Sequence, residues 1–246
     1  MLPRVCEPPP LDPKLEADVY REMDHGDVNR GFVRDLFESG PVGPRVIDLG
    51  CGPALIPITL CETAAAIVEG SRPAVSHGSD LSSLQVMGVD HCVDMLELAR
   101  VELEFAGMLG QIQLEQVDLN DPDGLQSELA ETVISNTVLH HLESPINALR
   151  LGIKALRPGG RLFVRDLYRP ETDREVERLV ELHGGSAEAA TSGIDPRQLL
   201  RQSLHAALTL EEIREIVATL GIDPGCVNMT SNRHWTLDCV RPERQS

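Results

Sequence analysis

Short apolar runs of strand length alternate with helical patterns through the middle of the chain. The runs span residues 45–50, 86–90, 112–118, 132–136 and 161–167. The clearest helical pattern follows Ser144 and Pro145, which cap and open a stretch whose apolar residues share one face. Apolar strands that alternate with helices predict an α/β fold, with a Rossmann-like, doubly wound and mostly parallel sheet and helices on both faces.

The two ends of the chain and two internal segments depart from this alternation. Residues 1–40 form a predicted N-terminal part, a proline-rich arm followed by two helices, the first of them capped by Asp12. Residues 41–246 form the predicted α/β domain, with a polar Ser- and Gly-rich insertion at 69–85 and a helical insertion at 171–205.

The C-terminal part predicts one more helix and a hairpin. Thr209 and Glu212 have the spacing of a capping box, and the helical pattern continues to Gly221. The tail "CVNMTSNRHWTLDCV" predicts two strands joined near Ser231 and Asn232.

Charge and cysteine usage narrow the classes of partner. The 246 residues include 22 Lys and Arg against 39 Asp and Glu, a formal net charge of -17, which repels nucleic acid and anionic membranes. A small molecule, an apolar compound or a basic protein stays open as a partner, and the oligomeric state is not readable. Six cysteines without a C-x-x-C pair, no signal peptide and no long apolar run predict a cytoplasmic protein.

Polar residues stand at the ends of four predicted strands: Asp48, Asp90, Asp118 and Asn136. In a doubly wound sheet, ligands bind at the carboxyl ends of the strands, where the strand order reverses. After Asp48, the two glycines of "GCGPAL" let the backbone pass close to a ligand, or else make only a tight turn. Leu55 stands where a dinucleotide motif has its third glycine, which counts against a nicotinamide cofactor.

The segment "VIDLGCGPA" is similar to the first motif of class I S-adenosylmethionine-dependent methyltransferases, with Ala54 in place of the third glycine. The segments "VMGVDHCVDMLELAR", "QVDLND", "VISNTVLHHL" and "ALRPGGRLFVRDL" resemble the motifs that follow, in the same order, over residues 46–168. "PPPLDPKLEADVY", "RDLYRP" and "SNRHW" look like an uncharacterised bacterial subgroup of small-molecule type. The resemblance implies a seven-stranded sheet with a C-terminal antiparallel strand, and N-terminal helices that act as a lid over the cofactor.

The resemblance also implies S-adenosylmethionine as cofactor and a role for each strand-end residue. Asp48 would lie near the methionyl ammonium, and Asp90 would accept hydrogen bonds from both ribose hydroxyls. Asp118 would face the adenine amino group, unless it only caps its loop, and Asn136 would lie under the methionyl part. The full predicted cofactor set is Asp48, Gly50, Cys51, Gly52, Asp90, His91, Met95, Asp118, Leu119 and Asn136.

The predicted catalytic residues are His140, Asp166 and Tyr168. Asp166 could instead form a structural ion pair with Arg165. No metal site is predicted, because His140 and His141 are adjacent, and adjacent side chains at a helix start diverge around the axis. Asp166 and Tyr168 follow the fifth predicted strand on the acceptor side of the pocket, whereas one of the two histidines is expected to pack or cap and the other to reach the active site.

Three functions from different classes fit these residues. The first is methyl transfer to an unidentified acceptor, probed by binding of S-adenosylmethionine; placing the two reactants suffices, and a general base is optional. The second is a non-catalytic or regulatory module that binds the same cofactor without transferring its methyl group. The third is a nicotinamide-dependent oxidoreductase, which needs a hydride-transfer constellation that the sequence does not contain.

Overall fold

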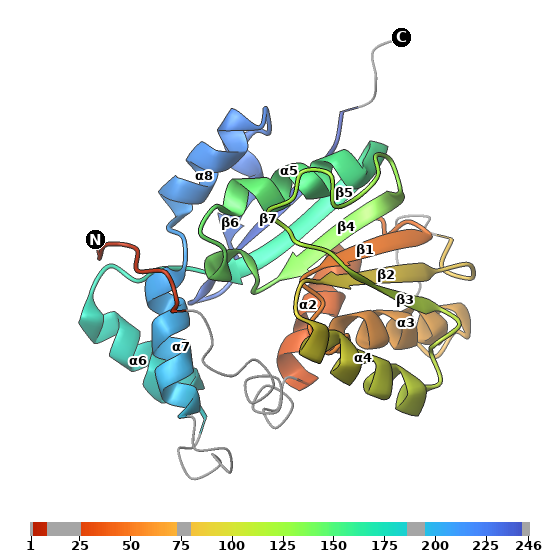
Figure 1. Ribbon diagram of the computed structural model, residues 1–246, viewed down its shortest axis with the longest axis horizontal. Coiled ribbons are helices and arrows are strands. Elements are labelled where there is room, and N and C mark those ends of the chain that lie inside the picture. The colour runs from red at the N-terminus through yellow and green to blue at the C-terminus, as the bar shows by residue number, and fades with distance from the viewer. Residues whose placement is uncertain (1, 9–25, 73–79, 186–194, 243–246) are drawn as a thin grey trace. The chain divides into compact units, whose positions relative to one another are not determined.

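A computed structural model of the chain describes residues 2–8, 26–72, 80–185 and 195–242. In these residues, seven strands form one sheet in the order β3-β2-β1-β4-β5-β7-β6 (Figure 1). The strands are β1 (Arg45–Leu49), β2 (Gln85–Asp90), β3 (Ile112–Gln116), β4 (Ala130–Asn136), β5 (Leu156–Leu167), β6 (Val227–Met229) and β7 (His234–Val240). The predicted fold class is confirmed, including the C-terminal antiparallel pair of β6 and β7.

The strand order reverses between β1 and β4. β1 pairs in parallel with β2 on one side and with β4 on the other, and β2 pairs in parallel with β3. The chain therefore runs outward from β1 to β3 and then returns to begin the second half of the sheet at β4. A crevice outside the carboxyl ends of β1 and β4 is where such a sheet binds its ligand.

The chain divides into two compact units, which are described here separately. The larger unit holds Met23–Asn136, Asn147–Val164 and Asp238–Ser246, and the smaller unit holds Met1–Glu22, Thr137–Ile146 and Arg165–Leu237. The predicted division into residues 1–40 and 41–246, with residues 1–40 as arm and lid, stays a prediction. Asp12 and residues 73–79 of the polar insertion lie outside the described residues.

Helices cover both faces of the strands in the larger unit. The helices α2 (Gly26–Ser39), α3 (Leu55–Val68) and α4 (Val93–Ala106) pack side by side, and α5 (Pro145–Ala155) lies across the sheet from them (Figure 1). Their common core is apolar, and Phe32 of α2 meets Phe163 of β5 edge to face with ring centroids 5.3 Å apart. An aromatic pair of this geometry adds about 0.5–1.5 kcal/mol to the effect of burial.

Two strands have other bounds than the sequence pattern predicts. β5 begins at Leu156 rather than at residue 161, because Gly159 and Gly160 exchange backbone hydrogen bonds of 2.9 and 2.8 Å with Arg241. The Pro-Gly-Gly segment, residues 158–160, therefore lies beyond the end of α5 and forms part of β5. β3 ends at Gln116, which leaves Asp118 in the loop beyond the strand.

The smaller unit holds the helical insertion. The helices of this unit are α6 (Asp173–His183), α7 (Pro196–Ala206) and α8 (Leu210–Thr219). The unit also contains two short 3-10 turns, η1 (Leu139–His141) and η3 (Pro224–Cys226). α6 and α7 pack together around a small apolar core. The predicted capping box at the start of α8 is confirmed, since Thr209 and Glu212 accept each other's backbone N–H. Among the described helices, none combines the length and apolar character needed to cross a bilayer.

Candidate cofactor and acceptor site

The loop after β1 bends over the end of β2 through three left-handed residues. Gly50 and Gly52 have φ angles of 72° and 51°, which glycine adopts without steric penalty. Ala54, at the third glycine position of the motif, has a φ of 60°, which costs a residue with a Cβ about 1–2 kcal/mol. The N–H groups of Gly50 and Cys51 both donate to the Val89 carbonyl, at 2.8 and 2.9 Å, so the end of β2 holds the loop.

Asp90 ties this loop to the start of α4. One carboxylate oxygen accepts the N–H of Gly52 and the other accepts the N–H of Cys92, both at 2.9 Å. A carboxylate oxygen has two lone pairs, so each oxygen can accept a further hydrogen bond from a ligand. A Cβ built on Gly52 would meet nothing within 4 Å, so the space above the loop is open. The geometry therefore suits a ligand with hydroxyl groups at the end of β2.

Asp48 makes the same place strongly electronegative. The side chain is buried, and burial together with the charge of Asp90 raises its pKa well above the usual range of an aspartate. Burial and the charges of Asp48 and Asp90 also raise the pKa of the Cys51 thiol. A cationic group arriving here would offset the repulsion between the two acids, as the ammonium of S-adenosylmethionine would.

Cys51 contributes through its backbone and its packing. A Cβ on Gly88 would lie 2.9 Å from the Cys51 sulfur, so glycine at this position in β2 makes room for the thiol. The sequence pattern predicts Cys51 as a cofactor contact but does not indicate its contact with Gly88. Gly88 is thus a residue of the site that sequence reasoning missed, and its position in the middle of a strand was the available signal.

The other predicted cofactor residues differ from one another in their burial and in the groups that they contact. Asp118 is exposed and accepts the Asn120 backbone N–H at 2.9 Å, which is the loop-capping alternative. Leu119 beside it is buried, and His91 is exposed with its Nδ1 3.7 Å from Asp90 Oδ1. Met95 is half-buried in the first turn of α4, and Asn136 is the last residue of β4. Their roles toward the cofactor stay predictions.

In the smaller unit, the structure brings His140 and Asp166 together. His140 Nδ1 lies 2.6 Å from Asp166 Oδ1, and both side chains are buried. Asp166 also accepts the backbone N–H of His140 at 3.1 Å and that of Leu167 at 2.6 Å. Burial alone would raise the Asp166 pKa, but the charge and hydrogen bond of His140 outweigh it and lower the pKa. The alternative partner, Arg165, donates to Thr236 instead, at 3.1 Å.

His140 and His141 do not diverge as expected for neighbours on an α-helix. They lie on η1, a turn of 3-10 helix, and their ring centroids are 4.0 Å apart. Both rings face Glu7: His141 Nδ1 is hydrogen-bonded to its carboxylate, and His140 Nε2 lies 4.0 Å from Oε1. Glu7 sits in a proline-rich segment, and no spacing or motif in the sequence connects it to residue 140.

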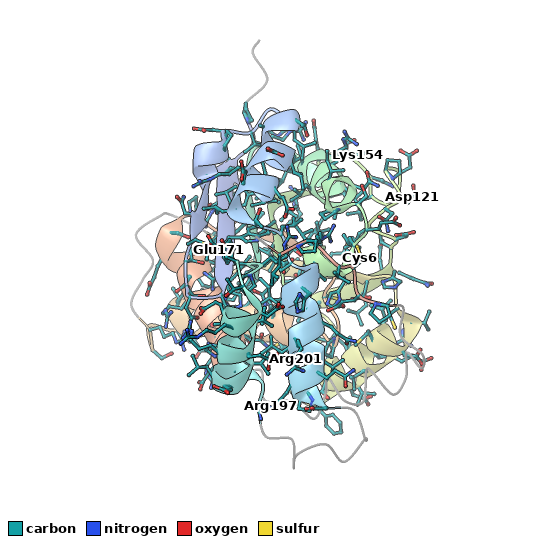
Figure 2. The ribbon with its side chains drawn as sticks, turned by 90° about the vertical axis from the view of Figure 1, so that its left-hand side faces the viewer. Cys6, Asp121, Lys154, Glu171, Arg197 and Arg201 are labelled. Atoms are coloured by element: carbon teal, nitrogen blue, oxygen red, sulfur yellow. The ribbon has the colours of Figure 1, made fainter. Side chains whose placement is uncertain are left out.

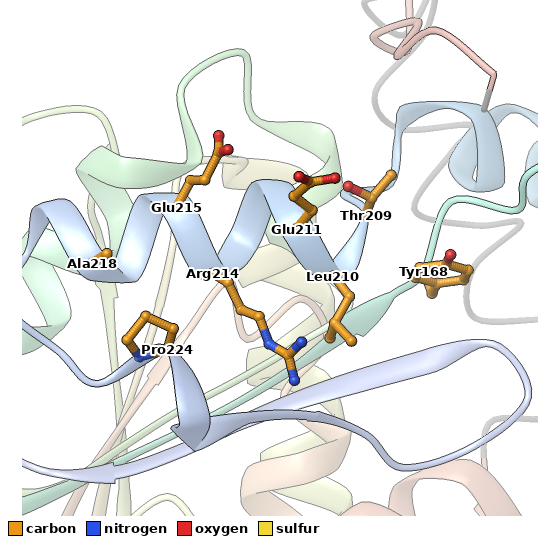
Figure 3. A pocket seen from close by; sticks show the side chains of 8 residues that line it. All are labelled: Tyr168, Thr209, Leu210, Glu211, Arg214, Glu215, Ala218 and Pro224. Carbon is orange, nitrogen blue, oxygen red and sulfur yellow. The ribbon is translucent and has the colours of Figure 1, made fainter.

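Tyr168 lines a pocket whose lining includes neither of the other two predicted catalytic residues. This pocket of about 590 Å³ lies along α8, and its other lining residues are Thr209, Leu210, Glu211, Arg214, Glu215, Ala218 and Pro224 (Figure 3). Burial and the charge of Glu171 raise the Tyr168 pKa, which keeps the phenol protonated at neutral pH. No other residue of the predicted site lines this pocket, so the pocket offers no evidence on catalysis.

The family model described as "Methyltransferase domain" matches residues 42–212. The chain belongs to this family. Its match covers the glycine loop, all predicted cofactor residues and most of the smaller unit. The predicted resemblance to class I S-adenosylmethionine-dependent methyltransferases is therefore confirmed, and with it the cofactor that the family uses.

Relatives and solved structures agree with this assignment. An uncharacterised 37.1 kDa protein of transposon TN4556 from Streptomyces fradiae is 28% identical over 87% of this chain and 57% of its own length. A ubiquinone biosynthesis O-methyltransferase from Xanthomonas axonopodis pathovar citri is 25% identical over 70% of this chain and 66% of its own length. The chain thus spans less than two thirds of either relative.

The fold itself matches a solved structure over almost the whole chain. A Methanococcus maripaludis protein described as an S-adenosyl-L-methionine-dependent methyltransferase superposes with a TM-score of 0.63, over 98% of this chain and 99% of that one, at 14% sequence identity. At this identity, the likeness shows a shared fold and leaves the acceptor open.

Proposed function

We propose that this methyltransferase-family domain transfers a methyl group from S-adenosylmethionine to a small-molecule acceptor. The observation that carries the proposal is the Asp90 carboxylate at the end of β2, which holds the N–H groups of Gly52 and Cys92 beside the buried Asp48. This arrangement provides acceptors for hydroxyl groups and a negative field for a cation at one edge of the sheet.

The residues of the larger unit fit the cofactor that the family implies. When bound, S-adenosylmethionine supplies a methyl group on a positively charged sulfur, which an oxygen, nitrogen, sulfur or carbon nucleophile can take. Asp90 would hold the ribose, and the backbone at Gly50 and Gly52 lets the ligand approach closely. Asp48, buried next to the Asp90 charge, would stabilise the positive end of the ligand.

Positioning is the main contribution that we assign to the protein. Holding two reactants in line can supply about 7–11 kcal/mol of the barrier, without any acid or base. A base is needed only for an acceptor that must lose a proton. A base role for His140, Asp166 or Tyr168 therefore stays a prediction that depends on the acceptor.

Two observations support a small molecule as acceptor. The named relative from Xanthomonas is a ubiquinone biosynthesis O-methyltransferase, a name that implies methyl transfer to a hydroxyl oxygen. The formal net charge of -17 disfavours association with a phosphate backbone. We therefore place phenolic and other neutral small molecules before nucleic acids as acceptors.

Isothermal titration calorimetry with S-adenosylmethionine and S-adenosylhomocysteine tests the cofactor site. We expect one site, and a loss of affinity of about 10- to 100-fold in Asp90→Asn, since a hydrogen bond to a charged group contributes about 1.5–3 kcal/mol. Glu97→Gln is the matched control, because it removes one exposed acid from the same helix that follows Asp90. Absence of binding to the folded protein, or equal binding by Asp90→Asn, would contradict the proposal.

Transfer is tested separately from binding. The protein is incubated with methyl-labelled S-adenosylmethionine and a panel of phenols, catechols, thiols and amines, and labelled product is counted. Product from at least one acceptor class is expected. Binding without transfer to any member of the panel would favour the predicted alternative, a non-catalytic or regulatory module.

A further inference from the structure

Three possible metal ligands converge in the smaller unit: Glu7, His140 and His141. One donor atom from each lies within 4.8 Å of the other two. His140 presents Nε2 to this space, and His141 presents Nδ1 to the Glu7 carboxylate. Donors bound to one Zn²⁺ at about 2.0–2.2 Å lie roughly 3–4 Å from one another, so small side-chain shifts bring all three to one ion.

Other side chains of this unit hold two of these donors in place. Asp166 Oδ1 lies 2.6 Å from His140 Nδ1, so a neutral His140 ring would carry its proton on Nδ1 and have its Nε2 lone pair on the side of Glu7. The Ser203 hydroxyl donates to Glu7 Oε1 at 2.6 Å. A carboxylate behind a histidine ligand is the usual support of a metal-binding histidine, since it fixes the tautomer and raises the basicity of the ring.

The electrostatics of the cluster also suit a cation. Burial alone would raise the Glu7 pKa, but the hydrogen bond and charge of His141, the charge of His140 and the Ser203 hydroxyl lower it to about 2. A divalent ion that displaces the protons of the two imidazoles would take their place as the positive partner of the Glu7 carboxylate. The neighbouring cation, Arg4, is directed to the backbone, where it donates to the carbonyls of Leu142 and Ala206 at 2.7 Å each.

The exposure of the three side chains leaves one side of the cluster open. The His141 side chain is 47% exposed, whereas those of Glu7 and His140 are 16% and 3% exposed. An ion can therefore enter past His141, and a water molecule or another ligand can complete its coordination. Three protein ligands with an open position are typical of zinc sites that are not purely structural.

We propose that Glu7, His140 and His141 together bind one divalent transition-metal cation of the zinc class. Two imidazoles and one carboxylate favour zinc and its transition-metal neighbours over Mg²⁺, which prefers oxygen ligands. The ion would join η1 to the N-terminal segment, residues 2–8, which already lies against the end of α7 through the hydrogen bond from Val5 N to His205 O, 3.1 Å. Cys6 marks this segment in Figure 2, and Arg197 and Arg201 mark α7.

This assignment excludes a general-base role for His140 while the ion is bound. The Nε2 lone pair would bind the metal, and Nδ1 already serves Asp166. All three ligands lie in the smaller unit, and the predicted cofactor residues lie in the larger one. The test below uses no cofactor, so its outcome does not depend on the proposed methyl transfer.

Metal-depleted protein, residues 1–246, is titrated with ZnCl₂ by calorimetry, with MgCl₂ as the comparison ion. We expect one zinc per chain, no heat from magnesium, and proton release that makes the enthalpy depend on the buffer. Glu7→Gln and His141→Gln should each weaken zinc binding by at least tenfold, and Asp166→Asn by about 10- to 100-fold. His205→Gln should leave it unchanged, since His205 is a half-buried histidine of the same unit that faces Asp173 instead.

Cobalt spectra distinguish a metal bound at this site from a metal bound by cysteines. Co²⁺ bound by two imidazoles and a carboxylate gives visible bands without the near-ultraviolet thiolate band, and Cys6→Ser should leave the spectrum unchanged. Circular dichroism confirms that each variant is folded. Zinc binding that survives both Glu7→Gln and His141→Gln, binding lost in Cys6→Ser alone, or no zinc binding by the folded protein would each overturn the proposal.

Discussion

Two buried aspartates in the strands of the sheet have pKa values that are shifted in opposite directions. Asp166 in β5, within the smaller unit, has a lowered pKa because His140 and two backbone N–H groups compensate for its burial. Asp48 in β1, within the larger unit, has a pKa raised well above its usual range, by burial and by the neighbouring Asp90. The residue type and the degree of burial are the same, so the difference comes from the surrounding donors and charges.

The chain itself stabilises the charge of Asp166, whereas the charge of Asp48 is one that a bound ligand could stabilise. Asp166 gains its partners on folding, and its charge fixes the ring of His140. Asp48 gains another acid, and its ionisation opposes folding. A raised pKa beside an open glycine loop is what the proposed role of Asp48 toward a cationic ligand would require, since perturbed acids often mark functional sites.

Removing the compensated acid should have the largest effect on stability. Asp166→Ala would leave His140 Nδ1 and the N–H groups of His140 and Leu167 buried without their acceptor. We expect a loss of about 3–5 kcal/mol in the free energy of unfolding, the usual cost of breaking a buried charged network. Urea denaturation followed by circular dichroism measures it.

The control for this experiment is Glu181→Ala, which removes an exposed acid from α6 in the same unit. It should change stability by less than about 0.5 kcal/mol. If Asp166→Ala costs no more than this control, Asp166 is not compensated as described, and the contrast with Asp48 disappears.

The sequence predicts more of the site in the larger unit than of the cluster in the smaller unit. Asp48 and Asp90 each end an apolar run and stand beside a glycine loop, so strand pattern and topology alone place them at one edge of the sheet. Asp118 was placed at a strand end by the same rule, but β3 stops two residues earlier, and Asp118 turns to Asn120. Alternation of residues in a strand does not specify where the hydrogen-bonded ladder ends.

The cluster around His140 needs contacts that no local pattern encodes. Glu7 and His141 are 134 positions apart, and Asp166 lies 26 positions from His140. The expectation that the two histidines diverge is wrong, because both rings turn toward Glu7 and their centroids lie 4.0 Å apart. The 3-10 turn itself does not explain this, since neighbouring residues of such a turn are about 120° apart around its axis. Only the tertiary structure brings the proline-rich N-terminal segment to this turn.

A smaller, pH-dependent loss is expected for Glu7→Gln in the presence of a chelator. The folded pKa of Glu7 is about 2, below its ordinary value of 4.5, so ionised Glu7 stabilises the fold above pH 4.5, and this contribution is lost as the pH falls toward 2. We expect roughly 1–3 kcal/mol at pH 7 and a shrinking difference below pH 4.5. Urea denaturation of both proteins at pH 7, 5 and 3 measures it, with Glu181→Gln as control. A difference that stays constant from pH 7 to pH 3 would show that Glu7 acts through packing rather than charge.

Asp48→Asn should produce the smallest change, and with the opposite sign. Because the folded pKa of Asp48 lies above its ordinary value of 3.8, its ionisation costs nothing below pH 3.8 and destabilises the fold increasingly as the pH rises above it. The variant should therefore be more stable than the parent protein at pH 7 and differ little from it at pH 3. The same variant should bind S-adenosylmethionine more weakly in calorimetry, since it lacks the charge assigned to the cationic end of the ligand. A variant that is less stable than the parent at pH 7, or that binds the cofactor equally well, would mean that Asp48 is a structural acid like Asp166.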